Sequence, residues 1–196
     1  MQSPARIRRV VTGHDRSGKA IVVSDGIAHA VKSNPLRPGH SSVDIWKTGA
    51  MPVPLGIDAA DPTGGVRTIH PAPNGTIIRI AEVPPESDAI RNMTPEQARE
   101  VFRANNNERA STWGRGGRHP LMHRTETIDY AVVLEGEITL LLDETDVNLK
   151  AGDVVIQRGT NHAWSNRSGE RCLMLYVLID GRFDPELAAQ FEGAGA

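Results

Sequence analysis

Two histidines and one aspartate stand where a plain apolar core would hold no polar group. His123 and Asp129 lie just before an apolar run, and His162 follows a glycine turn further along the chain. Strand side chains alternate between faces, so His123, Thr125 and Asp129 share one face if the strand is regular. If the strand that opens at His162 lies beside it, two imidazoles and one carboxylate converge. Such a set binds a divalent metal and leaves open positions for substrate, water or oxygen.

The elements that position these side chains are expected to be short strands. Four apolar runs follow His123, and each ends at a turn rich in Gly, Asp or both. They cover residues 130–134, 138–142, 147–149 and 154–156. No helical period runs through this part. Short strands at even spacing predict an all-β sandwich or barrel and argue against a parallel sheet with crossover helices.

This stretch resembles the two sequence motifs of the cupin family. The first motif matches, at the family's spacing, at Gly117, His123, Asp129 and Gly136. The second motif matches, one residue short before its proline position, at Gly152, Gly159, His162 and Asn166. Two motifs in register are a specific signal, which covers roughly the second half of the chain.

Three positions depart from the family pattern. Thr125 stands in place of the second histidine of the first motif, Asp129 in place of a glutamate, and Gln157 in place of a proline. A threonine is not a strong metal ligand, so the usual three-histidine site is incomplete. Cupins include dioxygenases, decarboxylases, isomerases, lyases and non-catalytic binding proteins, so the fold alone does not choose a reaction.

The resemblance implies an all-β cupin jelly-roll β-barrel over residues 74–182. Residues 1–73 hold strand patterns without enough apolar mass for a core of their own. We therefore expect an N-terminal β extension that packs on the barrel or on a dimer partner. Residues 183–196 are expected to form a short C-terminal helix and tail.

A helical and loop insert is predicted at residues 94–117, before the first motif. Thr94 is a suitable N-cap, Pro95 fits the first helical position, and Gln97 can close a capping box. The polar, glycine-rich end of the insert contains Trp113 and Arg115. It either folds over the barrel mouth as a lid or is an ordinary surface loop.

The predicted site residues fall into three groups. The metal ligands are His123, Asp129 and His162, and the resemblance implies one divalent transition metal: iron, manganese, nickel or zinc. The catalytic candidates are Asp129, Thr125 and Arg158. The substrate-binding candidates are Trp113, Arg115, Gln157 and Trp164. Each has a structural alternative, since a lone strand histidine or a surface arginine more often serves packing or solubility.

Composition limits the classes of function. The formal net charge is −2, with 22 Lys and Arg against 24 Asp and Glu, and no basic stripe is present. This argues against nucleic acid or an anionic membrane as a partner. The one cysteine, Cys172, lies beside an apolar run and is expected to be a buried thiol. No secretory signal or membrane span is recognisable, which predicts a cytoplasmic protein. Because cupin barrels commonly dimerise and exposed strand edges invite pairing, the resemblance implies a homodimer.

The favoured hypothesis is a metal-dependent cupin enzyme acting on a small oxygenated or aromatic organic substrate. Its chemistry would be of the lyase or isomerase type: dehydration, decarboxylation or a keto–enol shift. One alternative is an Fe(II)-dependent dioxygenase or other oxidoreductase, because the same ligands on iron activate oxygen. A second alternative is a non-catalytic small-molecule-binding cupin that has lost its metal.

Overall fold

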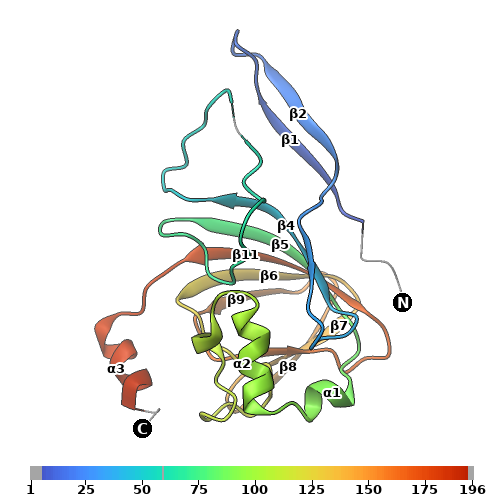
Figure 1. Cartoon of the computed structure of the whole chain (residues 1–196), viewed down its shortest axis with the longest axis vertical. Coiled ribbons are helices and arrows are strands. Elements are labelled where there is room, and N and C mark those ends of the chain that lie inside the picture. Colours follow the sequence, from blue (N-terminus) through green and yellow to red (C-terminus); the bar gives the residue numbers. More distant parts are fainter. Residues whose placement is uncertain (1–5, 59, 194–196) are drawn as a thin grey trace.

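The fold is mostly β, as expected. The computed structural model describes residues 6–58 and 60–193 (Figure 1). Its largest sheet has six antiparallel strands in the order β3-β4-β5-β11-β6-β9. Their bounds are Val31–Ser33 (β3), Ser41–Thr48 (β4), Thr76–Val83 (β5), Cys172–Asp180 (β11), Thr127–Glu135 (β6) and Val154–Arg158 (β9).

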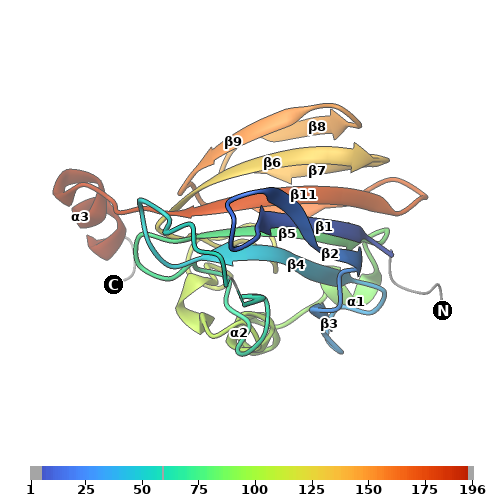
Figure 2. The same cartoon turned by 90° about the horizontal axis from the view of Figure 1, so that it is seen from above.

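A second, three-stranded sheet has the order β10-β7-β8. Its strands are Ala163–Ser165 (β10), Glu137–Leu141 (β7) and Asp146–Lys150 (β8). Figure 2 shows β7 and β8 beside the β6–β9 side of the large sheet. Strands that are distant in sequence are neighbours in the large sheet, since β5 and β6 both pair with β11. This antiparallel, non-sequential order is that of the predicted jelly roll.

The core lies between the two sheets. Along β6 the buried residues alternate with less buried ones, and Ala131 and Val133 point inward with Thr127 and Asp129. Ala131 and Val133 pack with Met174 of β11 and Ile138 of β7. Cys172 joins this cluster as a fully buried free thiol, as predicted.

The helices close one side of this body. Helix α2 (Pro95–Arg103) begins at Thr94 with the expected capping box: Thr94 Oγ1 accepts from Gln97 N at 3.2 Å, and Gln97 Oε1 accepts from Thr94 N at 2.8 Å. Its buried face, including Ala98 and Val101, packs against the loop before β6. The short helices α1 (Asp88–Arg91) and η1 (Glu108–Ala110) flank it, and the C-terminal helix α3 spans Pro185–Gly193.

The first hairpin projects from the body. Strands β1 (Arg8–His14) and β2 (Ala20–Ile27) pair only with each other, as Figures 1 and 2 show. Several of its apolar side chains are exposed, among them Val10, Val22 and Val23. The region predicted as an extension therefore divides: the hairpin stands apart, whereas β3 and β4 belong to the large sheet. The predicted homodimer stays a prediction.

Within the described residues, no helix is both long enough and apolar enough to cross a membrane.

Candidate active site

A cavity of about 160 Å³ brings together four of the side chains predicted from the sequence. His123, Asp129, His162 and Trp164 all line it. Its walls come from the inner face of the large sheet, from β10, from helix α2 and from the turn between β3 and β4. We take this cavity as the candidate active site.

The two histidines form a pair with fixed orientation. The backbones of His123 and His162 exchange two N–H···O bonds of 2.9 Å, and their ring centroids are 4.3 Å apart. Nδ1 of His123 lies 3.0 Å from the carbonyl oxygen of Leu121, and Nδ1 of His162 lies 3.0 Å from that of Thr160. A carbonyl oxygen only accepts, so in each neutral ring Nδ1 carries the proton and Nε2 keeps its lone pair.

Burial keeps both rings neutral. It lowers the pKa of His162 to about 4, and it lowers the pKa of His123 well below the usual range, where the neighbouring His162 adds to the effect. Within residues 6–58 and 60–193, neither Nε2 has a hydrogen-bond partner. The pair therefore offers two accepting nitrogen atoms to whatever enters the cavity.

Asp129 is buried in the same cavity and lacks a partner for one oxygen. Its side chain belongs to a residue only 5% exposed, and its Oδ1 makes no hydrogen bond in the described part of the chain. Burial raises the pKa of Asp129 to about 6, against the opposing influence of Thr127, His70 and Arg79. An orphaned buried carboxylate oxygen needs a donor or a cation from a ligand.

The predicted metal set is only partly assembled. Among the described residues, no group of three or more His, Cys, Asp or Glu side chains is placed to hold a metal ion. His123 and His162 can present their Nε2 atoms together, but Asp129 does not complete a three-ligand group with them. The described donor set as placed does not fit a resident three-ligand metal.

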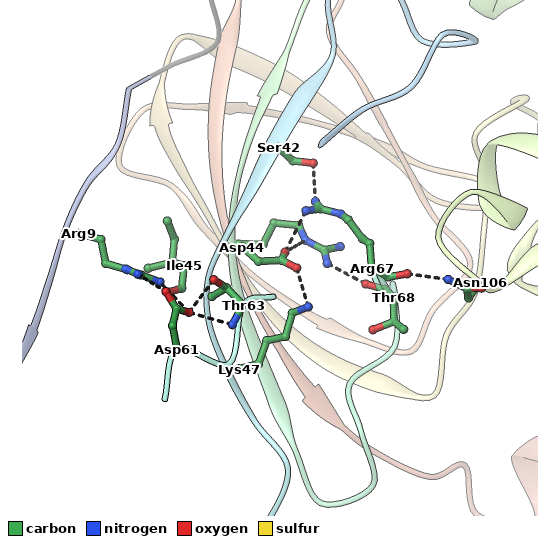
Figure 3. Close-up of polar contacts among 11 residues, drawn as sticks. Arg9, Ser42, Asp44, Ile45, Lys47, Asp61, Thr63, Arg67, Thr68 and Asn106 are labelled. Carbon is green, nitrogen blue, oxygen red and sulfur yellow. Dashed lines mark hydrogen bonds and ion pairs between the residues drawn. The ribbon is translucent and has the colours of Figure 1, made fainter. Parts of the chain in front are cut away.

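The sequence prediction missed a cationic wall of the cavity, which Arg67 and Arg79 form. Figure 3 draws the polar contacts around it. Arg79 Nε donates to Asp44 Oδ1 at 2.7 Å, Arg67 Nη1 lies 3.2 Å from the same oxygen, and Lys47 Nζ lies 3.1 Å from Asp44 Oδ2. Arg67 Nη2 also donates to Ser42 Oγ at 2.5 Å. Three cations thus share one buried carboxylate. A usable signal existed in the sequence, because Asp44 and Arg79 each stand between two β-branched apolar residues of a strand.

A further cation, Arg37, enters from the turn between β3 and β4. Burial lowers the pKa of Arg37 to about 10, so it stays charged at neutral pH. Its charge acts on His123, His40 and the buried Tyr176 hydroxyl, whose pKa is raised by burial. Nothing in the sequence marks this arginine, since it stands in a proline-rich loop far from either motif.

Two predicted site residues lie in a different place. Thr125 and Arg115 line a second, more open cleft of about 610 Å³ beside α3. Thr125 Oγ1 is paired with Thr127 Oγ1 at 2.8 Å, and Arg115 donates to the carbonyl oxygen of Arg109 at 2.9 Å and to that of Ser111. Thr125 is buried on the same face as Thr127, but it lines this second cleft and not the cavity of the histidine pair.

Three other candidates do not line the cavity. Arg158 is exposed, because its neighbour Gln157 takes the inward position on β9. Gln157 is buried, but its Nε2 donates to the carbonyl oxygen of Thr160 at 2.8 Å and to its hydroxyl at 2.5 Å. Trp113 Nε1 donates to the carbonyl oxygen of Met93 at 2.9 Å, so its ring packs among the helices. Gln157 and Trp113 therefore bond to the protein itself, and Arg158 faces solvent.

The covering element of the cavity is helix α2. Val101, Phe102 and Ala104, at the end of this helix, line it. The Phe102 ring centroid lies 4.9 Å from that of His123. Helix α2, at the start of the insert, therefore covers the cavity, whereas Trp113 and Arg115, at the polar end for which a lid or a surface loop was predicted, do not line it.

Comparison with known proteins agrees with this description. A family model described as a cupin domain matches residues 112–178. This part of the chain is a cupin domain. The match contains both histidines of the pair and Asp129, and it ends in β11, whereas Arg37, Asp44 and Arg79 precede it.

Two relatives that match part of this chain are named as biosynthesis cluster proteins of fungi. Phomopsin biosynthesis cluster protein D of Diaporthe leptostromiformis is 64% identical over 86 residues, which are 41% of this chain and 46% of that protein. Oryzines biosynthesis cluster protein J of Aspergillus oryzae is 44% identical over 68 residues, 34% of this chain and 38% of that protein. The chain thus aligns with less than half the length of these relatives.

A longer match has lower identity. The cupin-domain-containing oxidoreductase fogC of Aspergillus ruber is 26% identical over 183 residues, 90% of this chain and 73% of that protein. Among solved structures, a putative ethanolamine utilization protein Q from Salmonella typhimurium aligns with a TM-score of 0.42 and 10% identity, over 91% of this chain and 99% of that one. At a TM-score of 0.42 and 10% identity, this solved structure says nothing about the chemistry of the present chain.

Proposed function

We propose that this cupin is an enzyme that moves a proton on a small oxygenated organic molecule bound in the 160 Å³ cavity. The observation that supports this most directly is the His123–His162 pair. Both rings are buried, both Nδ1 atoms are held by carbonyl oxygens, and both Nε2 atoms are free to accept. A neutral imidazole of this tautomer presents a lone pair at Nε2 that can accept a proton.

The proposed step is of the lyase or isomerase type. A C–H bond beside a carbonyl breaks, its proton passes to Nε2 of one histidine, and its electron pair moves into the carbonyl group to give an enolate. Return of the proton at another atom completes an isomerisation, and loss of a leaving group completes an elimination. The cationic wall of Arg67 and Arg79 lies in the same cavity and stabilises the negative charge that develops.

Metal dependence stays a prediction. His123 and His162 would hold the ion through Nε2, and Asp129 would have to approach them to complete the set. Elemental analysis of the protein as purified, beside His162→Ala, tests this prediction. A metal that is stoichiometric in the wild type and lost in the variant supports it, and metal-free protein that takes up none on titration contradicts it.

An oxidoreductase is the second candidate. The names of relatives that align over most of the chain favour it, since fogC of Aspergillus ruber and srdB of Neurospora crassa are both described as cupin-domain-containing oxidoreductases. Their identities of 26% and 28% leave the chemistry of this chain open. Such a reaction would need oxygen or another electron acceptor.

One experiment separates the two candidates. Pyruvate, phenylpyruvate and phenylacetone are incubated with the enzyme in D₂O, with and without oxygen, and deuterium incorporation beside the carbonyl is followed by NMR. The proposal predicts exchange above the uncatalysed rate, independent of oxygen and lost in His162→Ala. Oxygen consumption without exchange would instead favour the oxidoreductase.

A further inference from the structure

Arg37 is a half-buried cation of the cavity wall whose guanidinium is not tied to the described part of the protein. Arg67 and Arg79 both contact Asp44. In contrast, no hydrogen bond or ion pair engages the guanidinium of Arg37 within residues 6–58 and 60–193. Asp129, in the same cavity, leaves its Oδ1 without a hydrogen bond as well, so these two groups do not satisfy each other.

The backbone around Arg37 is held in place. Arg37 N donates to the carbonyl oxygen of Asn34 at 2.9 Å, and the Asn34 side chain reaches the carbonyl oxygen of Val101 in α2 at 3.5 Å. Gly39 closes the turn with a φ of +80°, and a β-carbon there would lie 3.3 Å from Pro84. The turn is thus fixed to the covering helix and to the end of β5, so it presents Arg37 to the cavity in a defined place.

An unpaired, half-buried guanidinium favours an anion. Withdrawing a charge from water is costly unless a partner compensates it. The rigid fork of arginine matches a carboxylate through two parallel hydrogen bonds. The described cavity lining holds Lys32, Arg37, Arg67 and Arg79 against the single carboxylate of Asp129. The excess of positive charge points to a negatively charged ligand.

The rest of the lining favours a carbon skeleton on that anion. Apolar and aromatic side chains supply much of the wall, namely Val101, Phe102, Leu121, Trp164 and Leu178. A cavity of about 160 Å³ is close in size to an engineered cavity of ~150 Å³ that binds benzene. An inorganic anion would leave these apolar side chains unused, whereas a body the size of one ring would contact them.

We infer that the ligand of this cavity is a small organic acid, about the size of one aromatic ring, whose carboxylate pairs with Arg37. This deepens the proposed function, on which it rests for the cavity being the substrate site. The carboxylate on Arg37 would hold the reacting carbon against the histidine pair, and α2 would cover it.

Calorimetric titration tests the inference with three probes: benzoate, its neutral isostere benzamide, and inorganic phosphate. Wild type is compared with Arg37→Gln and Arg37→Lys, and Arg16→Gln, in the exposed hairpin turn, is the matched control. Benzoate is expected to bind the wild type more tightly than either other probe. Its affinity should fall roughly 10- to 100-fold in Arg37→Gln, because a charge-assisted pair is lost, less in Arg37→Lys, and not in Arg16→Gln.

Several results would overturn the inference. They are benzoate binding that is unchanged in Arg37→Gln, benzamide that binds as tightly as benzoate, phosphate that matches benzoate, and a wild type that binds none of the three. Circular dichroism establishes that the variants are folded. If Arg37→Gln is not folded, Arg37→Lys decides: unchanged benzoate affinity there contradicts bidentate pairing.

The inference and the proposed function fail in different ways. Benzoate binding that depends on Arg37, together with no deuterium exchange in any ketone, ends the proposed function and leaves the inference standing. Exchange that is equally fast in phenylacetone and in phenylpyruvate, and independent of Arg37, contradicts the inference and leaves the proposed function standing.

Discussion

The molecule has a larger cleft and a smaller cavity, and they differ in how many of their polar side chains already have hydrogen-bond partners. The larger cleft, of about 610 Å³, holds Thr125 and Arg115, whose side chains already bond to neighbouring groups. There Arg124 lies 3.6 Å from the centroid of the Phe191 ring, with its Nε unpaired. The smaller cavity, of about 160 Å³, holds the histidine pair, Asp129 and Arg37. Each of these side chains has a polar atom without a hydrogen-bond partner among the described residues.

Whether the polar groups already have partners is a better guide to function than the volume of the cavity. A polar group that is satisfied by the protein stabilises a loop, whereas a buried one that is not satisfied costs free energy until a ligand arrives. The smaller cavity concentrates such groups on several elements that are distant in sequence. The larger cleft mostly shows the internal bonding of an insert and a C-terminal helix.

The largest expected effect in the smaller cavity is that of His162→Ala. Removing a general base is expected to lower the deuterium-exchange rate about 100-fold or more. His14→Ala, in the exposed hairpin, is the control and should leave the rate unchanged. Exchange that survives in His162→Ala and in His123→Ala would show that the pair is not the base, and the contrast between the cleft and the cavity would lose its functional meaning.

Asp44→Asn tests whether the cationic wall is also structural. Asp44 is 2% exposed and joins Arg67, Arg79 and Lys47. Removing the shared carboxylate leaves buried cations uncompensated, which is expected to lower the free energy of unfolding by roughly 3 kcal/mol. Urea denaturation measures it. The control Asp25→Asn, in an exposed pair with Arg8, should have no measurable effect.

The same carboxylate predicts a pH dependence of stability. Burial alone would raise the pKa of Asp44, but Arg79, Arg67 and Lys47 outweigh it and lower the pKa in the folded state. The stabilisation is therefore present above the unfolded pKa of about 4 and is lost as pH falls below it toward the folded pKa. Urea midpoints should fall more steeply below pH 4 in wild type than in Asp44→Asn. Parallel profiles would contradict this origin.

Trp113→Phe examines a residue predicted as part of the lid. The change removes the hydrogen bond from Nε1 to the carbonyl oxygen of Met93. The free energy of unfolding is expected to fall by about 1 kcal/mol, with no loss of benzoate affinity. A large loss of affinity in a folded variant would restore Trp113 to the substrate site.

Arg115→Ala carries the smallest expected effect and tests the larger cleft directly. Its donors serve carbonyl oxygens of its own insert. We expect less than about a twofold change in exchange rate, since surface substitutions away from a site rarely matter more. A tenfold loss, measured under the same conditions, would transfer the proposed chemistry to the larger cleft.

Much of the fold could be predicted from local patterns. Thr94, Pro95 and Gln97 fix the start of α2 by bonds within four residues, and β5 occupies the apolar run that ends before Pro84. Strand β3 and helix α1 were not predicted, because each is very short and owes its form to its neighbours. Thr125 is buried as the alternation predicted, but the structure places it in the larger cleft and not beside the histidine pair.

By itself, the sequence determined the jelly-roll strands and the cupin motifs, because spacing and turn chemistry are local. The contact of His123 with His162 followed from the resemblance to cupins, and the structure shows it as a bridge between the two segments. Only the tertiary structure decided what surrounds that pair. It brought Arg37 from a loop and Arg79 from β5, and it placed Arg115 and Arg158 elsewhere. Charge compensation and burial depend on pairings across the sheet, which no spacing along the chain encodes.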